Sequence, residues 1–195
     1  MEPEPSVGFL HPGAMGSVLA ACCNTPRRFW MSPGRSAATV ERAEVAGLRA
    51  VSSLSELAQE ADMIVSVCPP AAASEVAAEV AATDFEGIFV DANAIAPAQT
   101  REIASSFNQF VDASIIGLPP TVPGATRLYL SGPGDPTRQV QRVWEGSLFD
   151  ARIVGESVGA ASALKMAYAG WTKGSMALLF TVVAAAQSEG LALCR

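Results

Sequence analysis

The sequence lacks the features that mark several other classes of protein. It has four cysteines, at positions 22, 23, 68 and 194, with no C-x-x-C pair, and His11 is the only histidine. We therefore expect no metal site and no disulfide framework, but buried thiols in a reducing compartment. The net charge is −6 without a basic run, which argues against a nucleic-acid partner. The longest apolar run, 176–186, is shorter than the roughly 20 residues that span a bilayer, so we expect no membrane partner.

The first residues also lack a targeting signal. Met1-Glu2-Pro3-Glu4-Pro5 is acidic and proline-rich, unlike a secretory or mitochondrial leader, and we expect a cytoplasmic protein. No internal repeat or low-complexity segment is present. A length of 195 residues with 50% apolar content suits one α/β domain with an appended segment.

Short apolar runs without polar alternation predict strands that are covered on both faces, as in a parallel sheet. Strands are expected at 5–10, 27–31, 49–51, 62–67, 87–91, 109–113, 125–131 and 148–153. Helices are expected between them, at 14–24, 36–46, 54–60, 71–82, 97–107 and 135–145. This alternation predicts a Rossmann-type, doubly wound and mainly parallel α/β domain over residues 1–155.

Residues 156–195 form a second unit. The stretch from Ser157 to about Leu193 contains no proline and predicts one helix of roughly 35 residues, near 50 Å long. Its second half, 177–186, is apolar nearly all round, so it should be buried against other helices. Trp30, Trp144 and Trp171 are most simply core residues.

Residues 7–17 contain most of a dinucleotide-binding turn between a strand and a helix. Gly13 would let the backbone approach the phosphates, and Gly16 would let the helix pack closely on the strand. His11 stands where the first glycine of G-x-G-x-x-G belongs, and a role in shaping the loop is favoured over a catalytic one. The alternative for the whole segment is ordinary turn chemistry. The expected cofactor contacts are Gly8, Leu10, His11, Pro12, Gly13, Ala14, Met15 and Gly16.

Two further loops are expected to contact the cofactor. After the second strand no carboxylate occurs until Glu41, but Arg35, flanked by Ser32 and Ser36, could bind a ribose 2′-phosphate. This favours NADP, with NAD possible; the alternative is a solvated arginine beside a helix-capping serine. The loop after the fourth strand contributes Val67, Cys68 and Pro69.

The start of the last helix is the candidate catalytic segment. Small residues at 159–163 leave room for a flat ligand, and Lys165 follows with Tyr168 and Thr172 on the same helix face. A lysine among apolar neighbours has a lowered pKa, which suits general acid/base work. The alternative is a lysine whose head group reaches the solvent from the side of the helix.

Polar residues follow two other strands, at Asp91-Ala92-Asn93 and Asp112-Ala113-Ser114, where side chains of such a sheet meet the ligand. Asn93 could orient a substrate. Alternatively, it caps the helix that begins at Pro97.

Together these segments resemble the β-hydroxyacid dehydrogenase family, which includes 6-phosphogluconate and 3-hydroxyisobutyrate dehydrogenases, with imine reductases as relatives. Within the family the chain looks like a branch with a 6-phosphogluconate-dehydrogenase-type NADP-binding domain. Gly8-Phe9-Leu10-x-x-Gly13-x-Met15-Gly16 is similar to its cofactor turn. Asp91-x-Asn93-x-x-x-Pro97 is similar to its D-x-[ST]-x-x-x-P segment, and Gly159-x-Ala161-x-x-x-Lys165 to its G-x-G-x-x-x-K catalytic helix.

The resemblance implies a Rossmann domain joined by a long interdomain helix to an all-α domain that completes the pocket and a homodimer. It also implies hydride transfer between a nicotinamide and a small hydroxy acid, carbonyl or imine, with Lys165 as the acid/base. Asn93, Ile116, Gly117 and Lys165 would contact the substrate. Three departures stand out: Ile116-Gly117-Leu118 replaces the family's S-G-G segment, Tyr168 and Ala169 replace its asparagines, and the all-α domain is absent. We therefore expect an incomplete form of this fold, with weak catalysis or none.

Overall fold

The computed structural model describes residues 4–191 and contains an eight-stranded sheet in the order β3-β2-β1-β4-β5-β6-β7-β8. All neighbouring strands are parallel except β6 and β7. The strands are β1 (Val7–Phe9), β2 (Arg28–Met31), β3 (Arg49–Val51), β4 (Met63–Ser66), β5 (Ile88–Asp91), β6 (Gln109–Ile116), β7 (Thr126–Ser131) and β8 (Phe149–Gly155). The predicted mainly parallel, doubly wound α/β fold is confirmed.

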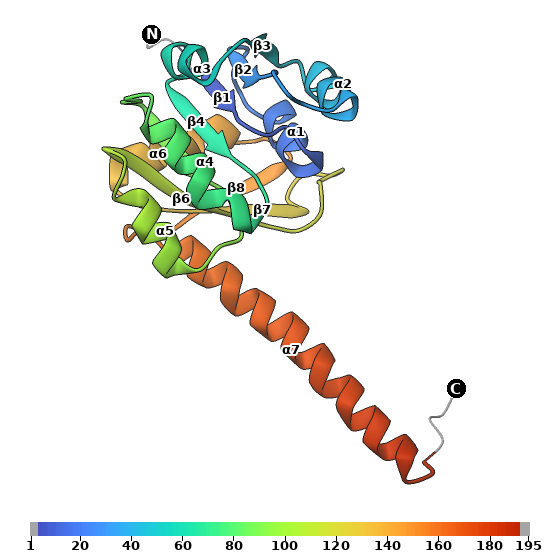
Figure 1. The fold of residues 1–195 in the computed structure, drawn as a ribbon. Helices are drawn as coiled ribbons and strands as arrows, with labels where there is room; N and C mark the ends of the chain where they lie inside the picture. The colour runs from blue at the N-terminus through green and yellow to red at the C-terminus, as the bar shows by residue number, and fades with distance from the viewer. Residues whose placement is uncertain (1–3, 192–195) are drawn as a thin grey trace.

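Helices alternate with the strands as predicted (Figure 1). They are α1 (Ala14–Ala21), α2 (Ala37–Val45), α3 (Leu54–Glu60), the 3₁₀ turn η1 (Pro70–Ala72), α4 (Ala73–Ala81), α5 (Pro97–Ala104), α6 (Gly134–Trp144) and α7 (Ala160–Ser188). The order of the strands reverses between β1 and β4, which are adjacent in the sheet. In folds of this kind, ligands bind at the carboxyl ends of the strands beside such a reversal.

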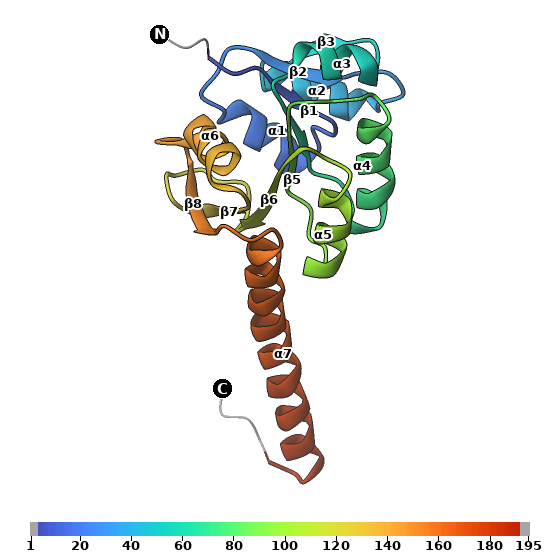
Figure 2. The same cartoon turned by 90° about the vertical axis from the view of Figure 1, so that its left-hand side faces the viewer.

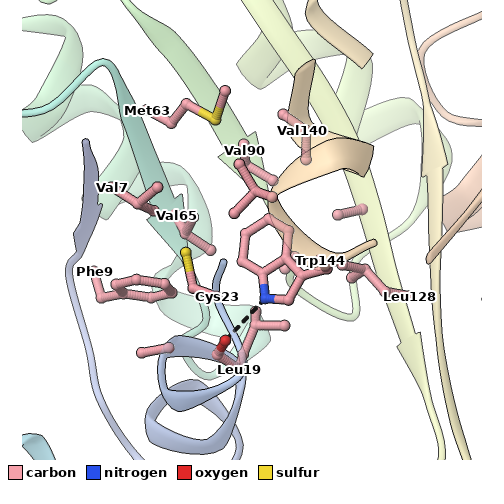
Figure 3. Packing of buried hydrophobic residues seen from close by; sticks show 14 of the residues in the cluster. Val7, Phe9, Leu19, Cys23, Met63, Val65, Val90, Leu128, Val140 and Trp144 are labelled. Atoms are coloured by element: carbon pink, nitrogen blue, oxygen red, sulfur yellow. Dashed lines mark hydrogen bonds between the residues drawn. The ribbon is translucent and has the colours of Figure 1, made fainter. Parts of the chain in front are cut away.

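Each face of the sheet carries its own apolar core. One core packs β1, β4 and β5 against α1 and α6, and it contains Trp144. The indole Nε1–H of Trp144 donates a 2.9 Å hydrogen bond to the Leu19 carbonyl at the end of α1 (Figure 3). The other core packs Ile64 and Phe89 of the sheet against α3, α4 and α5. Because both faces are covered, strands β4 and β5 are buried along their whole length.

Helix α7 leaves the domain as a rod (Figures 1 and 2). It has 29 residues, about 44 Å at 1.5 Å per residue, and within it only Ala161 and Ser162 are buried. Trp171 is 75% exposed, so its expected place in the core is wrong, whereas Trp30 and Trp144 are buried.

The second half of α7 lies open to solvent rather than packed on helices. By length and composition, α7 could cross a bilayer, and its most apolar window is not buried within the described residues. The apolar run at 176–186 is one part of this longer helix, and the absence of a membrane partner stays a prediction.

Candidate functional site

The turn after β1 has the geometry of a phosphate-binding turn. Gly13 is the N-cap residue of α1, and a Cβ placed on it meets no heavy atom of the described chain within 4 Å. A Cβ on Gly16 would lie only 2.5 Å from the His11 carbonyl oxygen. Gly16 therefore allows the helix to approach closely, as predicted, although its partner is the turn itself rather than the strand. The first N–H groups of α1 have no partner within the helix, and the space beside Gly13 is open.

The residues predicted to contact the cofactor in this turn differ in how deeply they are buried. Gly8 lies in β1, where a Cβ would be 2.9 Å from Leu57 of α3, so its small size is needed for packing. Leu10 is 2% exposed and belongs to the core. A contact of either residue with a ligand stays a prediction. Pro12 is buried, Ala14 is exposed, and Met15 is half-buried against the core below α1.

His11 and Arg35 carry buried polar atoms that the described residues do not satisfy. His11 Nδ1 and Arg35 Nε have no hydrogen-bond partner there. Burial and the nearby Arg35 charge lower the pKa of His11 to about 4, so its imidazole is neutral at pH 7. Unpaired buried donors and acceptors are costly, and a bound anion would satisfy them. These two side chains and the open space above Gly13 fit a dinucleotide that carries phosphate groups.

The serines beside Arg35 have structural partners. Ser36 is the N-cap of α2, and its hydroxyl accepts a 3.3 Å bond from the Thr39 N–H. Ser32 Oγ donates to the Val51 carbonyl at 3.3 Å. The capping serine of the alternative interpretation is therefore present. Arg35 itself is half-buried next to the turn, unlike a freely solvated arginine.

A second arginine reaches the turn and was not predicted. Arg42 Nε of α2 donates a 3.4 Å bond to the Pro12 carbonyl, and its Nη2 donates to Thr39 Oγ1 at 3.2 Å. Thirty residues separate Arg42 from Pro12, so no local pattern in the sequence relates them.

Asn93 holds two strand ends together rather than facing a ligand. It is 2% exposed; its Oδ1 accepts a 2.7 Å bond from the Cys68 N–H, and its Nδ2 donates to Ser66 Oγ at 3.1 Å. The interpretation of Asn93 as the cap of the next helix is wrong, since α5 has Ala96 as its N-cap residue. In this structure Asn93 therefore shapes the loop that contains Val67 and Cys68, and its contact with a substrate stays a prediction.

The loop after β4 adjoins the cofactor turn. Val67 Cβ lies 3.6 Å from the position of a Cβ on Gly16. Val67 and Cys68 are half-buried, and Pro69 is exposed. Burial raises the pKa of the Cys68 thiol, which makes it a poor nucleophile. Among residues 4–191 no group of three or more His, Cys, Asp or Glu side chains could hold a metal ion.

Lys165 lies at the end of β6, two strands from β4 in the sheet. Its Nζ donates a 2.5 Å hydrogen bond to the Ile115 carbonyl. Burial, with the charge of Lys173, lowers the pKa of Lys165. The head group is therefore held against the sheet, in contrast to the alternative of a lysine that reaches the solvent. Tyr168, one turn further along α7, is 50% exposed.

The residues expected at the substrate follow directly after this point. Ile116 is half-buried at the last position of β6, which is longer than predicted. Gly117 has a φ of +135°, and a Cβ there would lie 2.6 Å from Thr126 Oγ1. Gly117 is therefore required by the turn into β7, and its contact with a substrate stays a prediction.

Comparison with known proteins bears on the fold. No protein-family model matches the sequence. An uncharacterised 28.5 kDa protein of Methanothermus fervidus is 28% identical over 188 residues, covering 95% of this chain and 72% of that protein. A solved protein of unknown function, described as structurally similar to 3-hydroxyacid dehydrogenases, is 28% identical with a TM-score of 0.79, covering 95% of this chain and 71% of its own.

Two enzymes share the fold at lower identity. An imine reductase from Myxococcus stipitatus, solved with NAD+, has a TM-score of 0.78 and 22% identity, covering 98% of this chain and 68% of its own. Mycobacterium tuberculosis 3-hydroxyisobutyrate dehydrogenase has a TM-score of 0.77 and 19% identity, and the match covers 97% of this chain and 67% of that enzyme. The chain has the NAD(P)-binding fold of the β-hydroxyacid dehydrogenases. The predicted resemblance is thus confirmed at the level of the fold.

Proposed function

We propose that this protein is an NADP-dependent oxidoreductase that interconverts a carbonyl or imine and its reduced form. The observation that carries the proposal is Lys165, which is half-buried and bonded to the Ile115 carbonyl at the carboxyl edge of a Rossmann-like sheet. Imine reductases of this fold have been solved with NAD+ and with NADP+, which supports a nicotinamide cofactor.

The turn residues Gly13 and Gly16 would hold the pyrophosphate at the start of α1. Arg35 would bind the 2′-phosphate through charge-assisted hydrogen bonds, and Arg42 would support the turn through its bond to the Pro12 carbonyl. A bound nicotinamide would supply or accept the hydride. His11, neutral and beside Arg35, would shape this site rather than move protons.

Lys165 would transfer the proton. In reduction, its Nζ would give a proton to the substrate oxygen or nitrogen as the hydride reaches carbon, and in the reverse direction it would accept one. Its lowered pKa brings its acid and base forms closer to balance at neutral pH. Tyr168 would stand beside it on the same face of α7 and, being half-exposed, would face the substrate.

The test is turnover of a panel of hydroxy acids and cyclic imines with NADP(H). Loss of a positioned acid/base costs roughly 100- to 10,000-fold in rate, so Lys165→Ala should lose that much. Lys173→Ala, which removes the chain's only other lysine, is the matched control and should lose far less, because Lys173 is only the smaller cause of the lowered pKa of Lys165. If Lys165→Ala keeps its turnover while Tyr168→Phe abolishes it, the proton role belongs to Tyr168 and the chemistry favours imines.

The second candidate function is NADP binding without catalysis. It is favoured by the exposure of Tyr168 and Trp171, 50% and 75%, because a reacting site needs to exclude water. Cofactor binding together with no turnover across the whole panel would support this function.

We also propose that two copies of the chain associate through α7.

A further inference from the structure

Asp112 is a buried carboxylate that accepts four hydrogen bonds, and the proposed reaction does not use it. It is 0% exposed in the middle of β6. Its Oδ2 accepts hydrogen bonds from Ser131 Oγ at 2.9 Å and from the Gly159 and Ser162 N–H groups, each at 3.0 Å. Its Oδ1 accepts a fourth bond, from Ser162 Oγ at 2.7 Å.

These bonds fasten the first turn of α7 to the sheet. The first N–H groups of a helix have no partner within the helix, and a negative charge is favourable at this end. Asp112 satisfies two of these groups, and Ser131 Oγ accepts a third from the Ala161 N–H at 3.0 Å. Ser162 Oγ also lies 2.9 Å from Thr100 Oγ1 of α5. Strands β6 and β7 and helix α5 thus meet at one buried network below the start of α7.

The same strand also holds the head group of Lys165. Ile115, whose carbonyl accepts the Nζ bond, lies three residues after Asp112 on β6, roughly 10 Å further along the strand. Beyond its first two turns, the described positions of α7 are exposed or half-buried, and none is buried. The direction of this helix, and with it the place of Lys165, therefore depends on the attachment at its first turn.

We propose that Asp112 is a positioning residue for Lys165, because it anchors the start of α7 on the same strand that receives the lysine head group. The proposal rests on the proposed function only for the use made of Lys165. The anchoring itself can be measured without activity, through the titration of the Lys165 side chain. This titration can be followed separately because the chain contains just two lysines, Lys165 and Lys173.

The experiment is an NMR pH titration of the full chain labelled with ¹³C at lysine Cε, which gives two lysine signals. In the wild type, the Lys165 signal should titrate below the range of a solvated lysine. In Asp112→Asn, an NH₂ group takes the place of one carboxylate oxygen. This donor would face the N–H and O–H groups that the oxygen accepted from, so the start of α7 should be held less firmly. The Lys165 midpoint should then rise to the solvated range, while the Lys173 signal should stay unchanged.

The matched control is Asp150→Asn, whose carboxylate lies on β8 and bonds Arg152 instead of α7. It should leave both lysine signals in place. If Asp112→Asn does not fold, Ser131→Ala is the milder variant, because it removes only the bonds of Ser131 Oγ to Asp112 and to the Ala161 N–H. It should move the Lys165 midpoint in the same direction.

An unchanged Lys165 midpoint in a folded Asp112→Asn or Ser131→Ala protein would overturn the proposal, whatever its activity. Where turnover is present, Asp112→Asn should lower kcat with little change in KM for the cofactor. Absence of turnover in the wild type would count against the proposed function alone, since the NMR titration does not depend on it.

Discussion

The sheet domain and helix α7 are both rich in apolar residues, yet they place them in opposite surroundings. In the domain, Trp144 at the end of α6 is 0% exposed, packs against α1 and the sheet, and has its indole N–H bonded. On α7, Trp171 is 75% exposed, and Leu178, Phe180 and Val182 are each more than half exposed. The same kinds of side chain are therefore buried in one region and in water in the other.

This difference shows where each region obtains its order. The domain is stabilised by two apolar cores, whereas α7 is attached by a buried polar network at its first turn. Apolar side chains left in water contribute nothing to folding and favour association with another surface. The comparison thus separates residues that stabilise the fold from residues that we expect to contact a partner.

The largest expected effect comes from the two tryptophans. Trp144→Ala should lower the free energy of unfolding by about 3–5 kcal/mol, because it leaves a cavity and removes the partner of the Leu19 carbonyl. Trp171→Ala should change it by no more than about 0.5 kcal/mol. Urea unfolding of both variants at low protein concentration checks this. Equal losses would mean that α7 is packed as firmly as the domain.

The next effect concerns association. Burial of each apolar side chain contributes about 1.5–3 kcal/mol, so we expect the wild type to self-associate through α7. The double variant Leu178→Glu with Val182→Glu places two charges one turn apart on α7 and should weaken association by about 100-fold or more. Val45→Glu, at an apolar residue of α2 that is 85% exposed, is the control and should associate like the wild type. Light scattering over a concentration series measures this; a wild type that stays monomeric at high concentration contradicts the argument.

The smallest effect is a pH dependence confined to the sheet domain. The pKa of His11 falls from 6.5 to about 4 in the folded chain, mainly through burial, so this group makes folding more favourable as the pH rises through that window. Burial raises the pKa of Asp91 from 3.8 to about 6, so this group makes folding less favourable as the pH rises through 4–6. The two contributions oppose each other.

Two variants separate these contributions. Relative to the wild type, His11→Gln should lose stability as the pH rises from 4 to 6.5, and Asp91→Asn should gain it from 4 to 6. Urea unfolding at several pH values between 4 and 7 measures both differences. Differences from the wild type that do not change with pH would show that neither group is perturbed by the fold.

All eight strands and their order along the chain could be predicted, because a strand covered on both faces leaves an unbroken apolar run such as 63–67. The bounds were less certain: β6 continues to Ile116 because it pairs with β7, a partner that a local pattern does not reveal. Trp171 was misplaced for a related reason. An aromatic residue in an apolar stretch predicts burial, but burial requires a neighbouring surface, and among residues 4–191 none covers this one.

The candidate site was predicted in part. Gly16 and Lys165 were recognisable because turn and helix spacing are local signals. The structural roles of Asn93 and Asp112 were not, because their partners lie 19 to 50 residues away across strand connections. A polar residue near the end of a strand can face a ligand or a neighbouring backbone, and only the fold distinguishes the two. Arg42 was missed for the same reason.

The most direct test of the central claim, that the turn after β1 binds NADP, is a fluorescence titration with NADPH and with NADH. The wild type should bind NADPH more tightly. Arg35→Gln should reduce NADPH affinity to that for NADH, a loss of about 10- to 100-fold if the lost charge-assisted bonds contribute about 1.5–3 kcal/mol. Arg152→Gln, on β8 at the far edge of the sheet, should leave both affinities unchanged. Equal or tighter binding of NADH by the wild type would contradict the role of Arg35, and no binding of either would contradict the site itself.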